Sequence, residues 1–122
     1  MMDDKIQNLR NKIRKFIQEI IIFARTLPKD DIGRIFLRQI IRSATSIGAN
    51  FEESTEAESN KDVIHKMSIV RKETKETLYW LEIIESTFPT LNIKTQGLKT
   101  ECLELVRIFA SIINKRKLLP NT

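Results

Sequence analysis

The residues best suited to form a polar site lie in one stretch of the chain, from Gln39 to Glu58. Four side chains of this stretch could form a buried hydrogen-bonded site on one helix: Gln39, Arg42, Asn50 and Glu53. Small residues fill positions 43–46, 48 and 49 between them, with Ile47 among them, and such a run lets neighbouring helices approach closely because little side chain separates the backbones. Gly48 costs roughly 1 kcal/mol relative to Ala in a helix interior, so it also asks for a packing reason. Tight packing and a buried polar site both explain this stretch.

Other residues with catalytic or metal-binding chemistry are few. Glutamates cluster near the end of the stretch, but a carboxylate metal site in a helical bundle needs Glu-x-x-His pairs, which this chain lacks. His65 is the sole histidine, and Cys102, the sole cysteine, lies in an apolar periodic segment that favours a buried, inert thiol. No phosphate-binding loop, dinucleotide-binding glycine pattern or H-E-x-x-H motif is present. We therefore expect no catalytic residue, no metal and no cofactor.

Basic residues are the remaining candidates for a binding function. The formal net charge is +5 and the pI is about 9.5, which permits a polyanionic partner. Residues 1–27 hold six basic and three acidic side chains, and residues 90–122 hold six and two, so the positive excess lies on the first and last helices. The candidate nucleic-acid-binding residues are Arg10, Lys12, Arg14, Lys15, Arg34, Arg38, Lys115, Arg116 and Lys117.

Two other interpretations of these cations stay open. Lys115, Arg116 and Lys117 would close the last helical turn, where cations interact favourably with the helix dipole. Arg34 and Arg38 belong to a stripe that repeats every four residues, which is typical of a solvated or salt-bridged helix face. The glutamates in the link between the second and third helices would lie at the same end of the molecule as the cations that close the last helix. They would partly cancel the positive potential of those cations.

Apolar periodicity predicts four amphipathic helices. The first covers about residues 4–27, and the second starts after Lys29-Asp30-Asp31. The third covers about residues 60–87 with Ser59 as its N-cap, and the fourth follows Thr95-Gln96-Gly97 and ends near Leu119. We expect two threonines in the apolar stripe of the third helix to face the small residues of the second helix. Four such helices with short links predict an all-α, antiparallel up-down-up-down four-helix bundle in one domain, residues 1–122.

Several isoleucines lie outside the apolar stripe, or seam, that each helix would turn toward the core, and a monomeric bundle needs only one such stripe per helix. Left in water, this surplus would form an exposed apolar patch, so we expect a homo-oligomer that covers it. The candidate interface residues are Ile17, Ile21, Ile22, Ile41 and Ile113. One cysteine fits a reducing compartment, and the chain shows neither a signal peptide nor an apolar run of membrane-spanning length. We expect a cytoplasmic protein that does not contact membranes.

Three segments resemble one known family. They are L-R-Q-I-I-R-S-A-T-S-I-G-A-N-F-E-E at residues 37–53, S-N-K-D-V-I-H-K at residues 59–66 and E-T-L-Y-W-L-E at residues 76–82. The chain resembles the 23S rRNA intervening-sequence protein family, also called four-helix bundle proteins, over nearly its whole length. The most specific part is the pattern Q-x-x-R-[SA]-A-x-S-I-x-x-N-x-x-E, in which Gln39, Arg42, Ser46, Asn50 and Glu53 are the polar positions. Gly48-Ala49 departs from the Pro-Ser or Pro-Ala of many members, and Ser54 replaces a Gly.

The resemblance implies a left-handed bundle that assembles into a ring, usually a homopentamer, and it does not imply an enzyme. A related accessory protein of diversity-generating retroelements is a basic pentamer that binds nucleic acid and a reverse transcriptase. We expect the polar motif residues to hold the second helix against its neighbours through hydrogen bonds. The first functional hypothesis is a non-enzymatic oligomer that contacts RNA or DNA electrostatically through its first and last helices. The alternative is an oligomeric assembly or adaptor protein whose ring binds a protein partner and no nucleic acid.

Overall fold

The computed structural model describes residues 4–120, and all regular structure in that range is helical. There are four long helices and one short 3-10 helix: α1 Asp4–Ala24, α2 Asp31–Thr55, α3 Asn60–Thr87, η1 Pro89–Leu91 and α4 Asn92–Lys117. The predicted all-α, four-helix fold is confirmed. Within residues 4–120, no helix is long and apolar enough to cross a bilayer.

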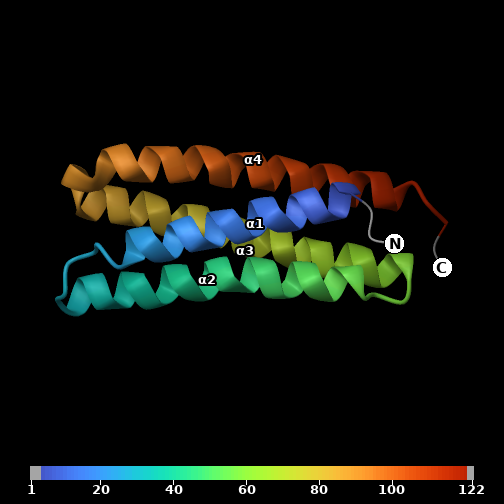
Figure 1. Ribbon diagram of the computed structural model, residues 1–122, viewed down its shortest axis with the longest axis horizontal. Coiled ribbons are helices and arrows are strands. Elements are labelled where there is room, and N and C mark those ends of the chain that lie inside the picture. The colour runs from blue at the N-terminus through green and yellow to red at the C-terminus, as the bar shows by residue number, and fades with distance from the viewer. Residues whose placement is uncertain (1–3, 121–122) are drawn as a thin grey trace.

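The four long helices lie side by side in a bundle, and each runs back along the one before it (Figure 1). Each packs against its predecessor, and α4 returns to α1. The beginning of α1, the α2–α3 link and the end of α4 therefore share one end of the bundle, which we call the terminal end (right in Figure 1). The α1–α2 link and η1 share the opposite end, the loop end.

Side-chain caps set the beginnings of two helices where the sequence predicts them. Asp30 caps α2, and its Oδ1 accepts a hydrogen bond from Gly33 N at 2.8 Å. Ser59 caps α3 in the same way, with Oγ accepting from Asp62 N at 3.1 Å. Both caps satisfy amide groups that have no acceptor within the first helical turn.

Two predicted helix boundaries are wrong. α1 ends at Ala24 rather than Leu27, because the following amides bond in tighter turns, such as Leu27 N to Ala24 O at 3.1 Å. α4 begins at Asn92 rather than after Gly97, because Pro89 starts a 3-10 turn that leads directly into the helix. Proline suits a first helical position, where its missing N–H costs nothing. Gly97 therefore lies inside α4 and does not precede it.

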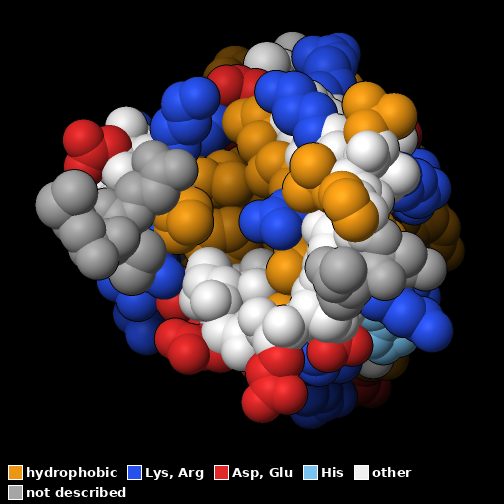
Figure 2. Space-filling view, turned by 90° about the vertical axis from the view of Figure 1, so that its right-hand side faces the viewer, with side chains coloured by type: hydrophobic (Ala, Val, Ile, Leu, Met, Phe, Trp, Pro, Cys, Tyr) orange, Lys and Arg blue, Asp and Glu red, His pale blue; other side chains and the backbone are white. Residues whose placement is uncertain are grey.

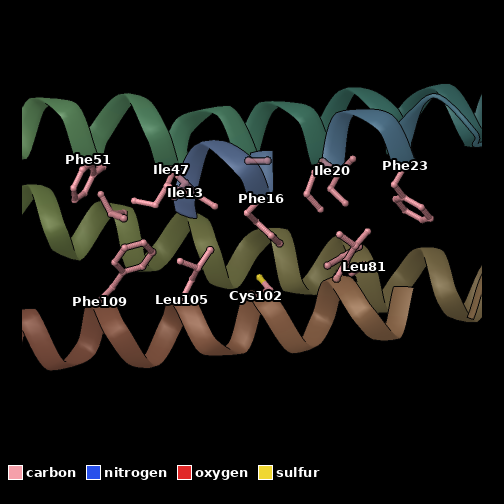
Figure 3. Close-up of a cluster of buried hydrophobic side chains, with 14 of the residues drawn as sticks. Ile13, Phe16, Ile20, Phe23, Ile47, Phe51, Leu81, Cys102, Leu105 and Phe109 are labelled. Carbon is pink, nitrogen blue, oxygen red and sulfur yellow. The ribbon is translucent and has the colours of Figure 1, made fainter. Parts of the chain in front are cut away.

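The core runs along the axis of the bundle and is filled by the periodic apolar residues from which the four helices are predicted. Figure 3 shows side chains from all four helices meeting there, including Ile20, Ile47, Leu81 and Phe109, each fully buried. Burying one such side chain contributes about 1.5–3 kcal/mol to stability, so this row supplies the main driving force for folding.

Ile113 belongs to this core, and its assignment to an oligomer surface is wrong. Its side chain is fully buried, whereas the adjacent Ile112, whose spacing from Phe109 would also suit the core, is half-buried. The buried positions of α4 advance from Leu105 to Phe109 and then to Ile113, two successive steps of four. A helix with 3.6 residues per turn mixes steps of three and four, and the choice between Ile112 and Ile113 depends on where the neighbouring helices lie.

A buried polar contact joins α2 to α3 near the middle of the bundle. Ser43 Oγ and Thr77 Oγ1 lie 2.8 Å apart, and both residues are fully buried. Thr74, one turn away, is also fully buried, and its carbonyl accepts a hydrogen bond from Cys102 Sγ of α4 at 3.2 Å. The expectation that two threonines of the third helix oppose the small residues of the second is therefore confirmed for Thr77, and the interhelical hydrogen bond of Thr74 is with α4.

The α1–α2 link supplies a test of the fold. A Cβ atom at Gly33 would overlap the carbonyl oxygen of Pro28 and lie 2.8 Å from its carbonyl carbon. Because that obstacle is backbone, we expect Gly33→Ala to lower the free energy of unfolding by about 1–3 kcal/mol in urea denaturation. Gly97→Ala is the matched control, since nothing lies within 4 Å of its added Cβ. That change should raise stability by up to about 1 kcal/mol. Equal effects of the two substitutions would contradict the structure of this link.

Candidate nucleic-acid interface

Positive charge gathers at the terminal end, which Figure 2 views directly. Lys and Arg side chains surround an apolar hollow in this view, and Asp and Glu side chains follow the lower edge. Lys115 and Lys117 of the last turn of α4 are exposed, and neither pairs with a carboxylate within residues 4–120. Cations in a last helical turn are held favourably by the helix dipole.

Arg116, between these two lysines, is fixed to the beginning of α3. Its Nη1 donates to Asn60 Oδ1 at 3.3 Å, and Asn60 Nδ2 donates to the Arg116 carbonyl at 2.9 Å. Arg116 is half-buried, and most of its five N–H groups have no partner among the described residues. The end of α4 thus presents one positioned guanidinium between two exposed ammonium groups.

Arg10 does not belong to this surface, and its prediction as a nucleic-acid-binding residue is wrong. The side chain is buried and makes a two-pronged ion pair with Glu52 of α2, from Nε to Oε2 at 2.7 Å and from Nη2 to Oε1 at 2.9 Å. A third donor, Nη1, bonds to Gln7 Oε1 at 3.0 Å. The hydrogen bond from Arg10 lowers the pKa of Glu52, and the same bond raises the pKa of Arg10. Arg10 therefore holds α1 to α2.

Most of the other predicted cations have local carboxylate partners. Four pairs lie along the helices: Lys12–Glu104 at 2.7 Å, Arg14–Glu52 at 3.8 Å, Lys15–Glu19 at 4.0 Å and Arg34–Asp31 at 3.8 Å. Exposed pairs of this kind contribute about 0–1 kcal/mol each, but they balance the charge locally. Arg38 is exposed and lies with Arg34 in the first half of α2, away from the terminal end. The nine predicted cations therefore do not form one surface, and the three of α4 are the group with the least compensation.

The acidic α2–α3 link lies at the same end, as expected. Glu52, Glu56 and Glu58 line a hollow of about 540 Å³ together with Asp62 and His65. Within residues 4–120, no group of three or more His, Cys, Asp or Glu side chains is arranged to hold a metal ion. Because the carboxylates of the link would repel an anion, an anionic partner at the terminal end would approach over α4.

The polar family motif forms no buried site. Arg42 bonds to Glu73 Oε2 of α3 at 3.2 Å and also pairs with Glu76, so it joins the two helices as expected. Glu53 accepts a hydrogen bond from Lys66 of α3 at 3.2 Å. Arg42 and Glu53 are exposed, but Glu73 is buried, so the Arg42–Glu73 contact is half-buried and the Glu53–Lys66 contact lies on the surface.

The other motif residues do not link helices through their side chains. Asn50 Nδ2 donates to the Ser46 carbonyl of its own helix at 2.9 Å, so the interhelical bond predicted for Asn50 is wrong. Gln39 and Ser46 are half-buried, and Gln39 makes no side-chain hydrogen bond within residues 4–120. The buried polar group of α2 is Ser43 instead. Of the two explanations for this stretch, tight packing is the one that the structure favours.

The off-seam isoleucines separate into different environments. Ile17 is half-buried, and its Cδ1 lies 2.8 Å from where a Cβ of Gly48 would stand, so the glycine makes room for it. Ile41 also packs against the core, and Ile21 is half-buried. Ile22 alone stays well exposed, at 66%. It lies with Ile93, which is 85% exposed, along a groove of about 390 Å³ between α1 and α4.

The thiol of Cys102 shows the expected buried environment. Cys102 is fully buried, and this burial raises the pKa of its thiol to about 12. Because the thiolate is the nucleophilic form, this thiol is poorly suited to nucleophilic chemistry at neutral pH.

Sequence reasoning missed two carboxylates that bridge helices. Glu85 of α3 accepts hydrogen bonds from Thr95 Oγ1 at 2.6 Å and from Lys99 Nζ at 3.0 Å, and both contacts lower the pKa of Glu85. Glu101 of α4 faces Glu19 of α1, and burial together with that neighbour raises the pKa of Glu101. No local spacing could indicate either contact, because both depend on how α4 docks.

The pKa of Glu52 is lowered and the pKa of Glu101 is raised, so replacing each glutamate by the isosteric glutamine should have opposite effects on stability. Because the pKa of Glu52 is lowered on folding, its stabilisation is present above its ordinary value of 4.5 and is lost as the pH falls through the lowered pKa. Because the pKa of Glu101 is raised, its contribution is favourable below 4.5 and is lost as the pH rises through the raised pKa. Glu52→Gln should therefore lower the urea midpoint at neutral pH, and Glu101→Gln should raise it.

Urea unfolding measured between about pH 3 and pH 8 checks this prediction. The difference between each variant and the wild type should shrink at the acidic end, where both carboxyls are protonated. Constant differences across the whole range would show that these ionisations do not govern the effect.

Comparison with known proteins places this architecture in a family. Residues 7–111 match the family described as 23S rRNA-intervening sequence protein. A search of curated proteins found no match.

A solved structure agrees with this result. The crystal structure of a protein with unknown function, from the S23 ribosomal protein family of Bacteroides thetaiotaomicron, is similar to this chain at a TM-score of 0.79. Its sequence is 33% identical, and the match covers 85% of this chain and 96% of that one. From the match over residues 7–111 and this likeness, the chain belongs to the 23S rRNA-intervening sequence protein family.

Proposed function

We propose that this protein is a non-enzymatic homo-oligomer that binds RNA or DNA through the terminal end of its bundle. The observation that carries the proposal is the group Lys115, Arg116 and Lys117, which no carboxylate balances within residues 4–120. Phosphates are the natural partners of such a group, because each contact releases condensed counterions. The name of the family, which refers to 23S rRNA, is consistent with a nucleic-acid partner.

The proposed assembly is a ring of left-handed bundles, with five copies as the family resemblance suggests. It rests on exposed apolar surface: Ile22 and Ile93 are 66% and 85% exposed and lie along the same groove between α1 and α4. Contiguous apolar surface of this kind marks an interaction site. We place the assembly in the cytoplasm and assign it no cofactor.

The same groove favours a second candidate function, an adaptor that binds a protein partner. In that case the groove takes the partner, and the cations of α4 only stabilise the helix end and keep the protein soluble. The two functions differ in whether nucleic acid is retained at low salt.

Reversing two lysines tests the nucleic-acid proposal. Lys115→Glu with Lys117→Glu should weaken binding of unrelated RNA and single-stranded DNA to a similar extent. It should also reduce the slope of log K against log salt by about one for each lost phosphate contact. Fluorescence anisotropy over a salt series measures both quantities.

A matched control separates position from net charge. Lys72 and Lys75 of α3 are exposed and pair with no carboxylate in the described part of the chain, and reversing both also lowers the formal net charge from +5 to +1. This control should keep most of the affinity. Equal losses in the two variants would reduce the effect to net charge, and a wild-type protein that retains no nucleic acid at low salt would refute the proposal.

Sedimentation velocity tests the assembly. The wild-type protein should sediment as one species several times heavier than the 14.3 kDa chain. Ile22→Glu should shift it toward the chain mass, because a charge cannot be buried unpaired in an apolar contact. Ile32→Glu is the control, since Ile32 is 48% exposed but does not line this groove. A wild-type species at 14.3 kDa would contradict self-association.

A further inference from the structure

The hollow at the centre of the terminal end is the mouth of the bundle core. Its volume is about 260 Å³, and all four long helices contribute to its wall. The apolar lining residues are Ile6, Leu9, Phe51, Val63, Met67 and Ile112. In Figure 2 this apolar surface is open to the viewer between Lys and Arg side chains. The volume is below that of typical pockets for drug-sized ligands, about 300–1,000 Å³, and suits a single ring system.

A second, more polar hollow of about 360 Å³ adjoins the first. Both are lined by Arg116, Ser54 and Thr55. The hydroxyl of Ser54 donates to the Phe51 carbonyl at 2.6 Å, and that of Thr55 donates to the Glu52 carbonyl at 2.7 Å. Each hydroxyl proton is therefore already used, and the lone pairs that remain can only accept hydrogen bonds. The pair of hollows combines apolar walls, two acceptors and a guanidinium.

Charge around the rim is unequal. Arg116 lies at the junction of the two hollows, with Lys115 and Lys117 beside it in the last turn of α4. Glu58 lines the outer hollow on the side of the α2–α3 link. A ligand with one apolar ring and several negative charges would insert the ring and place its charges toward α4, away from Glu58.

We propose that the inner hollow holds one unpaired nucleobase of a single-stranded nucleic acid, with its sugar in the outer hollow and its flanking phosphates on Arg116, Lys115 and Lys117. This inference rests on the proposed nucleic-acid function and specifies its substrate class as single strands. A nucleobase has flat apolar faces for the apolar walls, Phe51 among them, and N–H groups for the hydroxyl acceptors. Bases within a duplex are stacked and paired and cannot enter, whereas an unpaired base can be splayed out. Several adjacent cations fit a chain of phosphates better than the single charge of a fatty acid.

Competition between strand forms tests the proposal. An oligouridine should bind more tightly than an RNA duplex of equal charge, and Val63→Trp, which fills the hollow from its half-buried rim, should remove that preference. Loss of one stacked base typically weakens binding by about tenfold, so the single-strand affinity should fall by that factor while duplex affinity stays unchanged. Val63→Ala is the control and should keep the preference. Equal affinities of the wild type for the two forms would overturn the proposal and leave electrostatic binding intact.

Photo-crosslinking of the unaltered protein avoids any effect of a substitution on folding. An oligouridine that carries one 4-thiouridine should crosslink to residues of the inner hollow, such as Phe51 or Met67. Crosslinks confined to residues outside the hollow would overturn the proposal.

Displacement by decanoate tests whether the hollow binds a singly charged amphiphile instead of a nucleobase. If it displaces an apolar fluorescent dye from the hollow and oligouridine does not, the hollow belongs to an amphiphile and the proposal fails. Failure of the wider nucleic-acid function is distinguishable, because then neither single strands nor duplexes bind at low salt.

Discussion

The close approach of α2 and α3 is the constraint on which the rest of the bundle depends. Ser43 and Thr77 meet at its centre, fully buried, with their hydroxyl oxygens 2.8 Å apart. Whichever hydroxyl donates to the other, its partner can donate to a carbonyl of its own helix, Ile40 or Glu73, so both groups are satisfied. A larger side chain would separate the helices, and an aliphatic one would remove the hydrogen bond between them, which contributes about 0.5–1.5 kcal/mol. Small polar residues therefore suit both positions.

This contact fixes how the remaining helices dock. Thr74 continues the layer toward α4, where its carbonyl accepts a hydrogen bond from the Cys102 thiol, and Arg42 reaches from α2 to Glu73 and Glu76 of α3. α1 and α4 are joined more sparsely than the other neighbouring pairs. They also bring the carboxyls of Glu19 and Glu101 together, which is unfavourable when both are ionised. The tight side of the bundle is therefore α2–α3–α4, and the open side is the groove between α1 and α4.

The sequence predicts most of the fold because its determinants are local. Apolar spacing, Asp30 and Ser59 act within a few residues of where they stand, so the existence of four helices and two of their beginnings could be predicted. Errors arise where the answer depends on a neighbour. Ile112 and Ile113 are both apolar and adjacent, and only the direction of α1 and α3 decides that Ile113 is buried.

The candidate site was less predictable for the same reason. Counting charges locates the positive excess on the first and last helices, but it treats Arg10 and Lys115 alike. Glu52 lies 42 positions from Arg10, and their ion pair exists because α1 and α2 pack together. Likewise, no segment of the sequence contains the hollow at the terminal end, since all four helices contribute to its wall.

Local pairing, rather than net charge, therefore decides which cations are available to a partner. Lys115, Arg116 and Lys117 stabilise the end of α4 through the helix dipole whether or not a ligand binds, so their presence alone does not establish a function. The adjoining hollow distinguishes them, because apolar walls left open to water are unfavourable for a free protein. Neither a helix terminus nor a core requires that juxtaposition, and a ligand that is both apolar and anionic would cover the walls and balance the cations together.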